Sequence, residues 1–190
     1  MDALRVARLR EALTGTEWPQ ATREFGAALR GAARRGGGGL LLVGTHAYEP
    51  WHMAAHLEEE AAWASAPELA PTLVRHRVPE GARPHLSVGL ARLAAARRGE
   101  TVLVVAPAAV EDAFLDRLAS VRRAGARVLA LDATDGADLR GVAHESLVLP
   151  RALSLDAAQH LVAAGAAHAP RSRSRLARLA DRLTTPPPRW

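Results

Sequence analysis

The stretch ETVLVVAPAAVEDAFLDRLASVRRAGARVLALDA, residues 100–133, contains the pattern that decides the fold of this chain. It opens with a continuous apolar run, which is typical of a strand buried on both faces of a sheet. An amphipathic segment follows and stops at Gly125, which indicates a helix with a glycine just past its end. A second apolar run begins near Arg127. A strand, a helix and a strand in this order predict two parallel strands joined by a crossover helix.

The same alternation extends through most of the chain. Apolar runs predict further strands at residues 40–44, 71–76 and 145–150. We therefore predict an α/β fold, a three-layer domain with a mostly parallel five-stranded sheet flanked by helices. A single domain would span residues 1–169. Its expected parts are N-terminal helices within 1–35 (at 2–13 and 19–34), an α/β core at 36–150 (with helices at 50–63, 87–98 and 108–124), a final helix at 154–168, and then a basic, proline-rich tail at 170–190.

Composition narrows the class of protein. The chain has 190 residues, of which 48% are hydrophobic, so it is long enough and apolar enough to bury a core. It contains no cysteine, which excludes disulfides and thiolate metal sites. The net charge is +5, but the arginines alternate with acids along helices, and the one basic cluster, RSRSRLARLADR at 171–182, has no interleaved aromatics. We therefore expect no nucleic-acid partner, no membrane partner and a cytoplasmic location.

Two loops are the expected ligand-binding segments. In parallel sheets of this kind, ligands bind at the carboxyl ends of the strands, near the point where the strand order reverses. The loops there are GTHAYEP at 44–50 and APAAVED at 106–112. His46 and Glu49 in the first loop are candidate catalytic groups, each able to act as an acid or a base. A capping or loop-stabilising role explains them about equally well.

Four histidines fall in two helical segments far apart in the chain. His52 and His56 lie four residues apart in YEPWHMAAHLEEE, and His160 and His168 lie eight apart in SLDAAQHLVAAGAAHAP. The first spacing places both rings on one helix face, as in helices that bind zinc, although such pairs also arise by chance. Eight residues place the second pair about 80° apart around a helix. The spacings alone leave a metal site open.

The segment 38–149 resembles a sugar isomerase (SIS) domain, and the flanking helices are similar to the layout of phosphoheptose isomerases. The resemblance is carried by GETVLVVAPAAVEDAFLDRLASVRRAGARVLALDATDGADLRGVAHESLVLP, residues 99–150, which keeps the order of strands, helices and apolar motifs of that family. It implies a homo-oligomer that binds a sugar phosphate and interconverts an aldose and a ketose.

Both ligand loops depart from the family pattern. SIS proteins hold the phosphate with a loop rich in serine and threonine, whereas the loop at 106–112 has no hydroxyl and carries two acids. Phosphoheptose isomerases have GNGGS where this chain has the loop at 44–50. The resemblance leaves Gly44, Thr45 and Tyr48 as candidate substrate-binding residues. We therefore predict that sugar phosphates bind weakly.

The histidines follow the family more closely. HMAAHL matches an HFAxEL segment of phosphoheptose isomerases, with His52 on the family's histidine and His56 on its glutamate. His160 matches a glutamine and His168 a histidine of their last helix. Several of those enzymes bind zinc at these four positions. The resemblance thus implies one divalent metal on four histidines, with zinc as the first candidate and nickel, copper or iron as alternatives.

Three functions remain open at this point. The first is a phosphoheptose-isomerase-like protein that binds a sugar derivative beside a metal, with aldose–ketose isomerisation as its reaction. The second is a non-catalytic SIS module that senses a sugar derivative or assembles with a partner. The third is a metal-dependent hydrolase or lyase on the same scaffold.

Overall fold

A computed structural model describes residues 13–134, 137–150 and 153–168 of the chain. Most of the helix predicted at 2–13 and the whole tail at 170–190 lie outside these described residues. Within the described residues, the alternation of strands and helices that the sequence predicts runs from residue 40 to residue 167. No helix among the described residues is both long and apolar enough to cross a membrane.

The sheet confirms the predicted fold class. Its five strands are all parallel, in the order β2-β1-β3-β4-β5, so the order reverses between β1 and β3. Each strand coincides with one of the apolar runs, because strands covered on both faces have no solvent-facing side to fill with polar residues. The strands are β1 (Leu40–Val43), β2 (Pro71–Val74), β3 (Thr101–Ala106), β4 (Arg127–Asp132) and β5 (Glu145–Val148).

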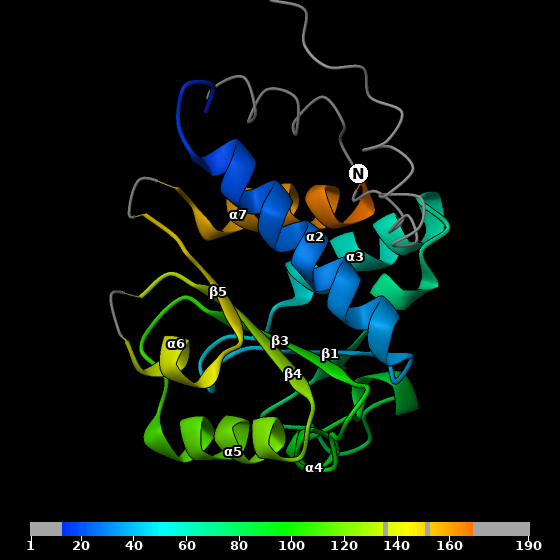
Figure 1. Ribbon diagram of the computed structural model, residues 1–190. Coiled ribbons are helices and arrows are strands. Elements are labelled where there is room, and N and C mark those ends of the chain that lie inside the picture. Colours follow the sequence, from blue (N-terminus) through cyan, green and yellow to red (C-terminus); the bar gives the residue numbers. More distant parts are fainter. Residues whose placement is uncertain (1–12, 135–136, 151–152, 169–190) are drawn as a thin grey trace, which may run out of the picture.

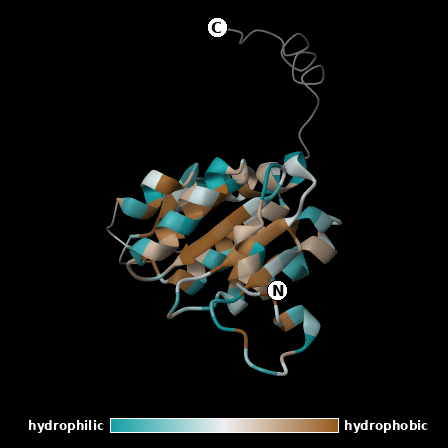
Figure 2. Ribbon diagram, turned by 90° about the horizontal axis from the view of Figure 1, so that it is seen from below, coloured by the Kyte–Doolittle hydropathy of each residue, from teal (hydrophilic) through white to brown (hydrophobic). Residues whose placement is uncertain are grey.

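Helices cover both faces of the sheet, which makes three layers (Figure 1). Figure 2 shows the apolar strands enclosed between helices whose outer surfaces are largely polar. The upper layer contains α2 (Trp18–Gly36), α3 (Trp51–Trp63) and α7 (Leu155–Ala167). The lower layer contains α4 (Leu90–Ala94) and α5 (Asp112–Arg123), with α6 (Asp138–Val142) packed against α5 and β4; two short 3-10 helices are η1 (Pro67–Leu69) and η2 (Pro84–Leu86).

Side chains alternate between two apolar cores. On β3, Leu103 and Val105 pack with the upper helices, while Val102 and Val104 pack with the lower ones, and all four are fully buried. At about 25 cal/mol for each Å² of apolar surface removed from water, each such side chain contributes roughly 1.5–3 kcal/mol. The sheet is therefore a rigid base for the loops at its edges.

The predicted helix at 87–98 is wrong in its bounds. Gly89 has an extended backbone and Ser87 does not cap the helix, so α4 begins only at Leu90. The helix ends early because the Glu100 side chain accepts the Arg97 N–H at 2.9 Å, in place of an intrahelical carbonyl. The helix predicted at 108–124 likewise begins later, at Asp112.

The final helix is positioned by close backbone packing against α2. A Cβ atom on Gly26 would lie 2.5 Å from the Ala166 backbone nitrogen, so only glycine allows this approach. The predicted cap is present, since Ser154 Oγ accepts the Ala157 N–H at 3.2 Å. Every residue from Ala157 to Ala167 is buried, so α7 lies at the centre of the upper layer.

Candidate metal centre and switch-point cavity

Three histidines converge between α3 and α7. His52 and His56 stand one turn apart on α3, and His160 comes from α7, more than a hundred residues later. The ring centroids of His52 and His56 are 4.5 Å apart, and His160 lies 4.7 Å from the first and 4.0 Å from the second. One ring nitrogen from each lies within 4.8 Å of the other two, which makes this a group able to hold a metal ion.

The cluster is largely shielded from solvent. His160 is only 4% exposed, and His52 Nε2 is buried with no hydrogen-bond partner among the described residues. Burial lowers the pKa of His56, and the neighbouring His52 lowers it further, while Glu59, 3.5 Å from His56 Nδ1, opposes both effects. Neutral imidazole is the form that binds metals, so the lowered pKa of His56 favours its use as a ligand.

This donor set fits a small divalent ion. Nitrogens around a tetrahedral zinc at about 2.0–2.1 Å are roughly 3.3–3.4 Å from one another, so small side-chain rotations would close the cluster onto one ion. Three histidines with a fourth position left for water or substrate are a ligand set that zinc uses in catalytic sites. The same nitrogens also suit nickel, copper or iron.

His168 does not join the group that the structure brings together. It sits at the carboxyl end of α7, where its side chain is exposed and its Nδ1 lies 2.7 Å from the Ala164 carbonyl oxygen. The group within 4.8 Å contains the other three predicted histidines and not His168. Turning about 80° around the helix from His160 takes the ring away from α3.

A cavity of about 210 Å³ lies where the strand order reverses, between the loops after β1 and β3. Both segments predicted to bind ligand contribute to it: Thr45 and His46 from the first, Ala108 and Ala109 from the second. Its polar lining comes from five side chains. They are Thr45, His46, His76, Glu111 and Arg117.

The predicted substrate-binding residues occupy different positions around this cavity. Thr45 is 7% exposed and lines it, whereas Gly44 and Tyr48 do not. A Cβ on Gly44 would lie within bonding distance of the Tyr48 carbonyl oxygen, so the tight loop requires glycine there. The Tyr48 hydroxyl accepts a hydrogen bond from Gln159 Nε2 at 3.2 Å. Tyr48 thus ties the loop to α7 beside His160.

The two predicted catalytic groups are also separated. His46 lines the cavity, and its Nε2 lies 2.9 Å from Arg77 Nη2, so that nitrogen accepts a hydrogen bond. Glu49 accepts hydrogen bonds from Arg75 Nε at 3.0 Å and from Trp51 Nε1 at 2.9 Å. Its carboxylate therefore fixes the loop to the end of β2, which is the loop-stabilising role that the sequence left open.

His76 is a cavity residue to which sequence reasoning assigned no role. Its Nε2 donates to the Gly44 carbonyl oxygen at 3.0 Å, which leaves Nδ1 as the nitrogen able to take up a proton. Burial lowers the pKa of His76, and the hydrogen bond to Gly44 partly offsets this. His76 comes two residues after β2, and the rule that ligands bind at the carboxyl ends of strands would have identified it.

Comparison with known proteins adds information on the fold. No family model matches the sequence, and no curated protein matches it. A solved structure described as "Putative sugar binding protein from Salmonella typhimurium LT2" shares the architecture with a TM-score of 0.52 and 15% sequence identity. The match covers 86% of this chain and 46% of that one, so this chain spans less than half of the other protein. At such low identity the likeness establishes the fold alone.

Proposed function

We propose that this chain is an SIS-type protein that binds a sugar derivative and holds one divalent metal, zinc in the first place, on His52, His56 and His160. The convergence of the three imidazoles carries this proposal. The carboxyl-edge cavity supplies the place for the sugar derivative, and the fold that the chain shares with a sugar-binding protein supports that ligand class. His168, the fourth ligand predicted from the sequence, is left out of the proposed set because its Nδ1 faces the Ala164 carbonyl.

Metal content tests the first half of the proposal. The chain, purified without a histidine tag and reloaded with zinc, should contain one zinc per chain by elemental analysis. His160→Ala should lose this zinc, since two ligands hold the ion far less tightly than three. The matched control is His46→Ala, which removes an exposed histidine outside the cluster and should retain it. Equal zinc content in both variants would refute the site.

The cavity offers His46 and His76 for isomerisation, but Glu49, the other catalytic group predicted from the sequence, does not line it. Moving a proton between adjacent carbons needs a base with a pKa near the working pH and a group that stabilises the oxyanion. Of the two predicted catalytic groups, His46 lines the cavity, where His76 joins it, while Glu49 is held by Arg75. We therefore assign proton transfer in the isomerase reading to His46, assisted by His76.

A non-catalytic sugar-binding module is the second candidate. The observation that favours it is the engagement of Glu49 by Arg75 and Trp51, which leaves this carboxylate unavailable as a base. An assay of aldose–ketose interconversion with sedoheptulose 7-phosphate and zinc-loaded protein distinguishes the isomerase from the non-catalytic module. Turnover that His46→Ala abolishes supports the isomerase, whereas binding without turnover supports the module.

A further inference from the structure

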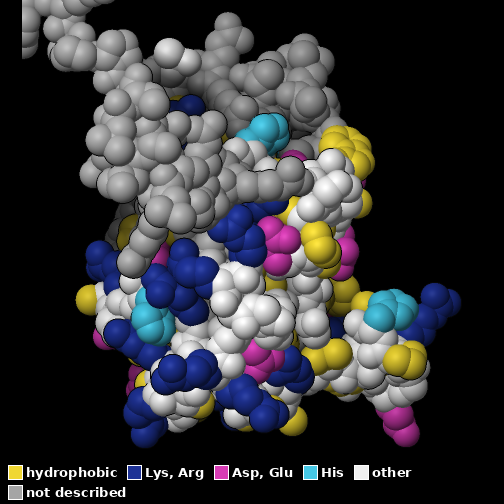
Figure 3. All heavy atoms as spheres, turned by 45° about the vertical axis from the view of Figure 1, so that its right-hand side comes forward, with side chains coloured by type: hydrophobic (Ala, Val, Ile, Leu, Met, Phe, Trp, Pro, Cys, Tyr) yellow, Lys and Arg dark blue, Asp and Glu magenta, His cyan; other side chains and the backbone are white. Residues whose placement is uncertain are grey.

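A second hollow, of about 450 Å³, opens at the opposite edge of the sheet, where the strands begin. Three arginines from separate parts of the chain line it. Arg35 ends α2, Arg98 precedes β3, and Arg127 begins β4. Figure 3 brings the right-hand side of Figure 1 forward and shows arginine side chains gathered over the lower part of that face.

The one carboxylate in the lining is already neutralised. Glu100 forms an ion pair with Arg92, whose side chain is not part of the lining, and it also accepts the Arg97 N–H. Among the described residues, neither Arg35 nor Arg98 has a hydrogen bond or an ion pair from its side chain. The hollow therefore carries two positive charges that the surrounding protein does not balance.

Arg127 is the third arginine of the lining. Its Nη2 pairs with Glu145 Oε1 at 2.8 Å, but its Nε is buried without a hydrogen-bond partner among the described residues. The backbone amides of Glu100 and Gly125 offer no further donor to the hollow, because each already donates to a carbonyl oxygen.

Two arginines outside the lining, Arg122 and Arg30, have partners within the protein. Arg122 donates to the carbonyls of Gly141 and Val142 at the end of α6. Arg30 pairs with Glu68 at 3.1 Å and donates to the end of α7. Structural pairing thus accounts for Arg122 and Arg30 but not for Arg35 and Arg98, which line the hollow.

We propose that this amino-edge hollow binds a small molecule carrying two or more phosphate groups. Guanidinium groups bind phosphate oxygens through paired N–H donors, and arginines from separate segments of the chain favour more than one phosphate group. The volume falls within the range of small-ligand sites. The site lies at the far edge of the sheet from the switch-point cavity, so it does not depend on the proposed sugar or metal function.

Calorimetric titration of the full chain with inorganic tripolyphosphate tests the proposal. EDTA is present throughout, so that the probe is not held through a metal on the histidine cluster. Arg35→Gln combined with Arg98→Gln should weaken binding about ten-fold or more, as expected for the loss of two charge-assisted contacts. Replacing the same two residues by lysine should restore part of the affinity, because charge returns without the paired geometry.

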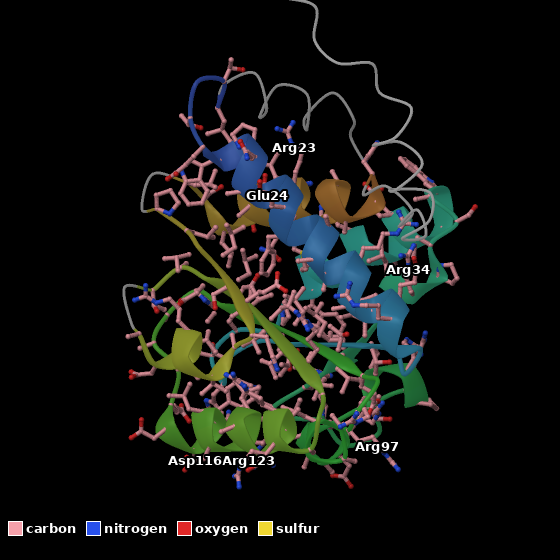
Figure 4. The ribbon with its side chains drawn as sticks, viewed as in Figure 1. Arg23, Glu24, Arg34, Arg97, Asp116 and Arg123 are labelled. Carbon is pink, nitrogen blue, oxygen red and sulfur yellow. The ribbon has the colours of Figure 1, made fainter. Side chains whose placement is uncertain are left out.

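The matched control changes the net charge by the same amount outside the hollow. Arg34→Gln combined with Arg123→Gln removes two exposed arginines at the ends of α2 and α5 that do not line the hollow (Figure 4). This variant should bind tripolyphosphate within about two-fold of the original chain, since exposed charges outside the site are screened. Equal weakening in both double variants would overturn the proposal, because it would mean that general surface charge attracts the probe. Much tighter binding of a single-stranded oligonucleotide than of tripolyphosphate would also overturn it.

Discussion

The histidine cluster and the switch-point cavity differ in what surrounds their polar atoms. The cluster lies in the upper helical layer, where α3 and α7 bring three imidazoles together and bury His160 almost completely. The cavity lies in the loops at the carboxyl edge, where several alanines line it and Thr45 is the one hydroxyl side chain of its lining. The histidine cluster brings together nitrogen atoms that can bind a metal, whereas the cavity provides space with few hydrogen-bond donors.

This difference shows that the topology of the sheet and the chemistry of the residues locate different features of the molecule. The rule that ligands bind at the strand-order reversal locates the cavity. It does not locate the metal-capable nitrogens, which lie behind the loop in the helical layer. Tyr48 connects the two regions, since it belongs to the first loop and hydrogen-bonds to Gln159, the neighbour of His160.

The largest expected effect comes from breaking the sheet that supports both regions. Val104 is fully buried in the lower core, so Val104→Asp would place an unpaired carboxyl group there. That cost is a large part of the roughly 5–15 kcal/mol that stabilises a typical domain. We expect no cooperative thermal transition by circular dichroism. Thr72→Asp, on the exposed side of edge strand β2, should still melt cooperatively, and a folded Val104→Asp protein would contradict the assigned core.

Zinc-dependent stability distinguishes three ligands from the four that the sequence predicts. Zinc at about a hundred times its dissociation constant should stabilise the original chain by roughly 2.7 kcal/mol. His168→Ala should keep this gain, because the ring lies outside the cluster, whereas His56→Ala should lose most of it. Melting temperatures recorded with and without zinc measure the gain in stability for each variant. Loss of the gain in His168→Ala would restore the four-histidine site.

The cavity is expected to respond more weakly. We predict that sedoheptulose 7-phosphate binds the original chain no tighter than about millimolar, or roughly −4 kcal/mol. Glu111→Gln removes a negative charge from the lining and should tighten binding about three- to ten-fold. Glu58→Gln, on the exposed face of α3, should leave calorimetric affinity unchanged. Micromolar binding by the original chain would show that Arg117 or Thr45 replaces the lost hydroxyls.

The smallest expected effect is on how stability depends on pH, and it concerns His144, which lies outside both the histidine cluster and the switch-point cavity. Burial lowers the pKa of His144, and the charges of Arg122 and Arg127 lower it further. As the pH falls below about 6.5, the unfolded chain binds a proton first, so stability decreases until the folded chain also binds it. His144→Gln should make melting temperature fall less steeply with decreasing pH. An unchanged slope would show that the remaining histidines account for the whole dependence.

The sequence by itself determined the sheet and the location of its ligand edge. Strands buried on both faces require continuous apolar runs, and β3 and β4 contain five and four consecutive apolar residues, so local composition was sufficient. The bounds of α4 were not predictable in this way. They depend on the Glu100 side chain taking the Arg97 N–H, a contact that no hydrophobic period reveals.

Only the tertiary structure decided which histidines meet. The rotation of α7 is set by its backbone contact with Gly26 on α2, and this rotation turns His160 toward α3 while His168 remains exposed. Likewise, Arg35 and Arg98 are 63 positions apart and face one hollow because α2 ends where β3 begins. Such meetings depend on how helices pack across the sheet, and sequence spacing within one helix carries no information about a second helix.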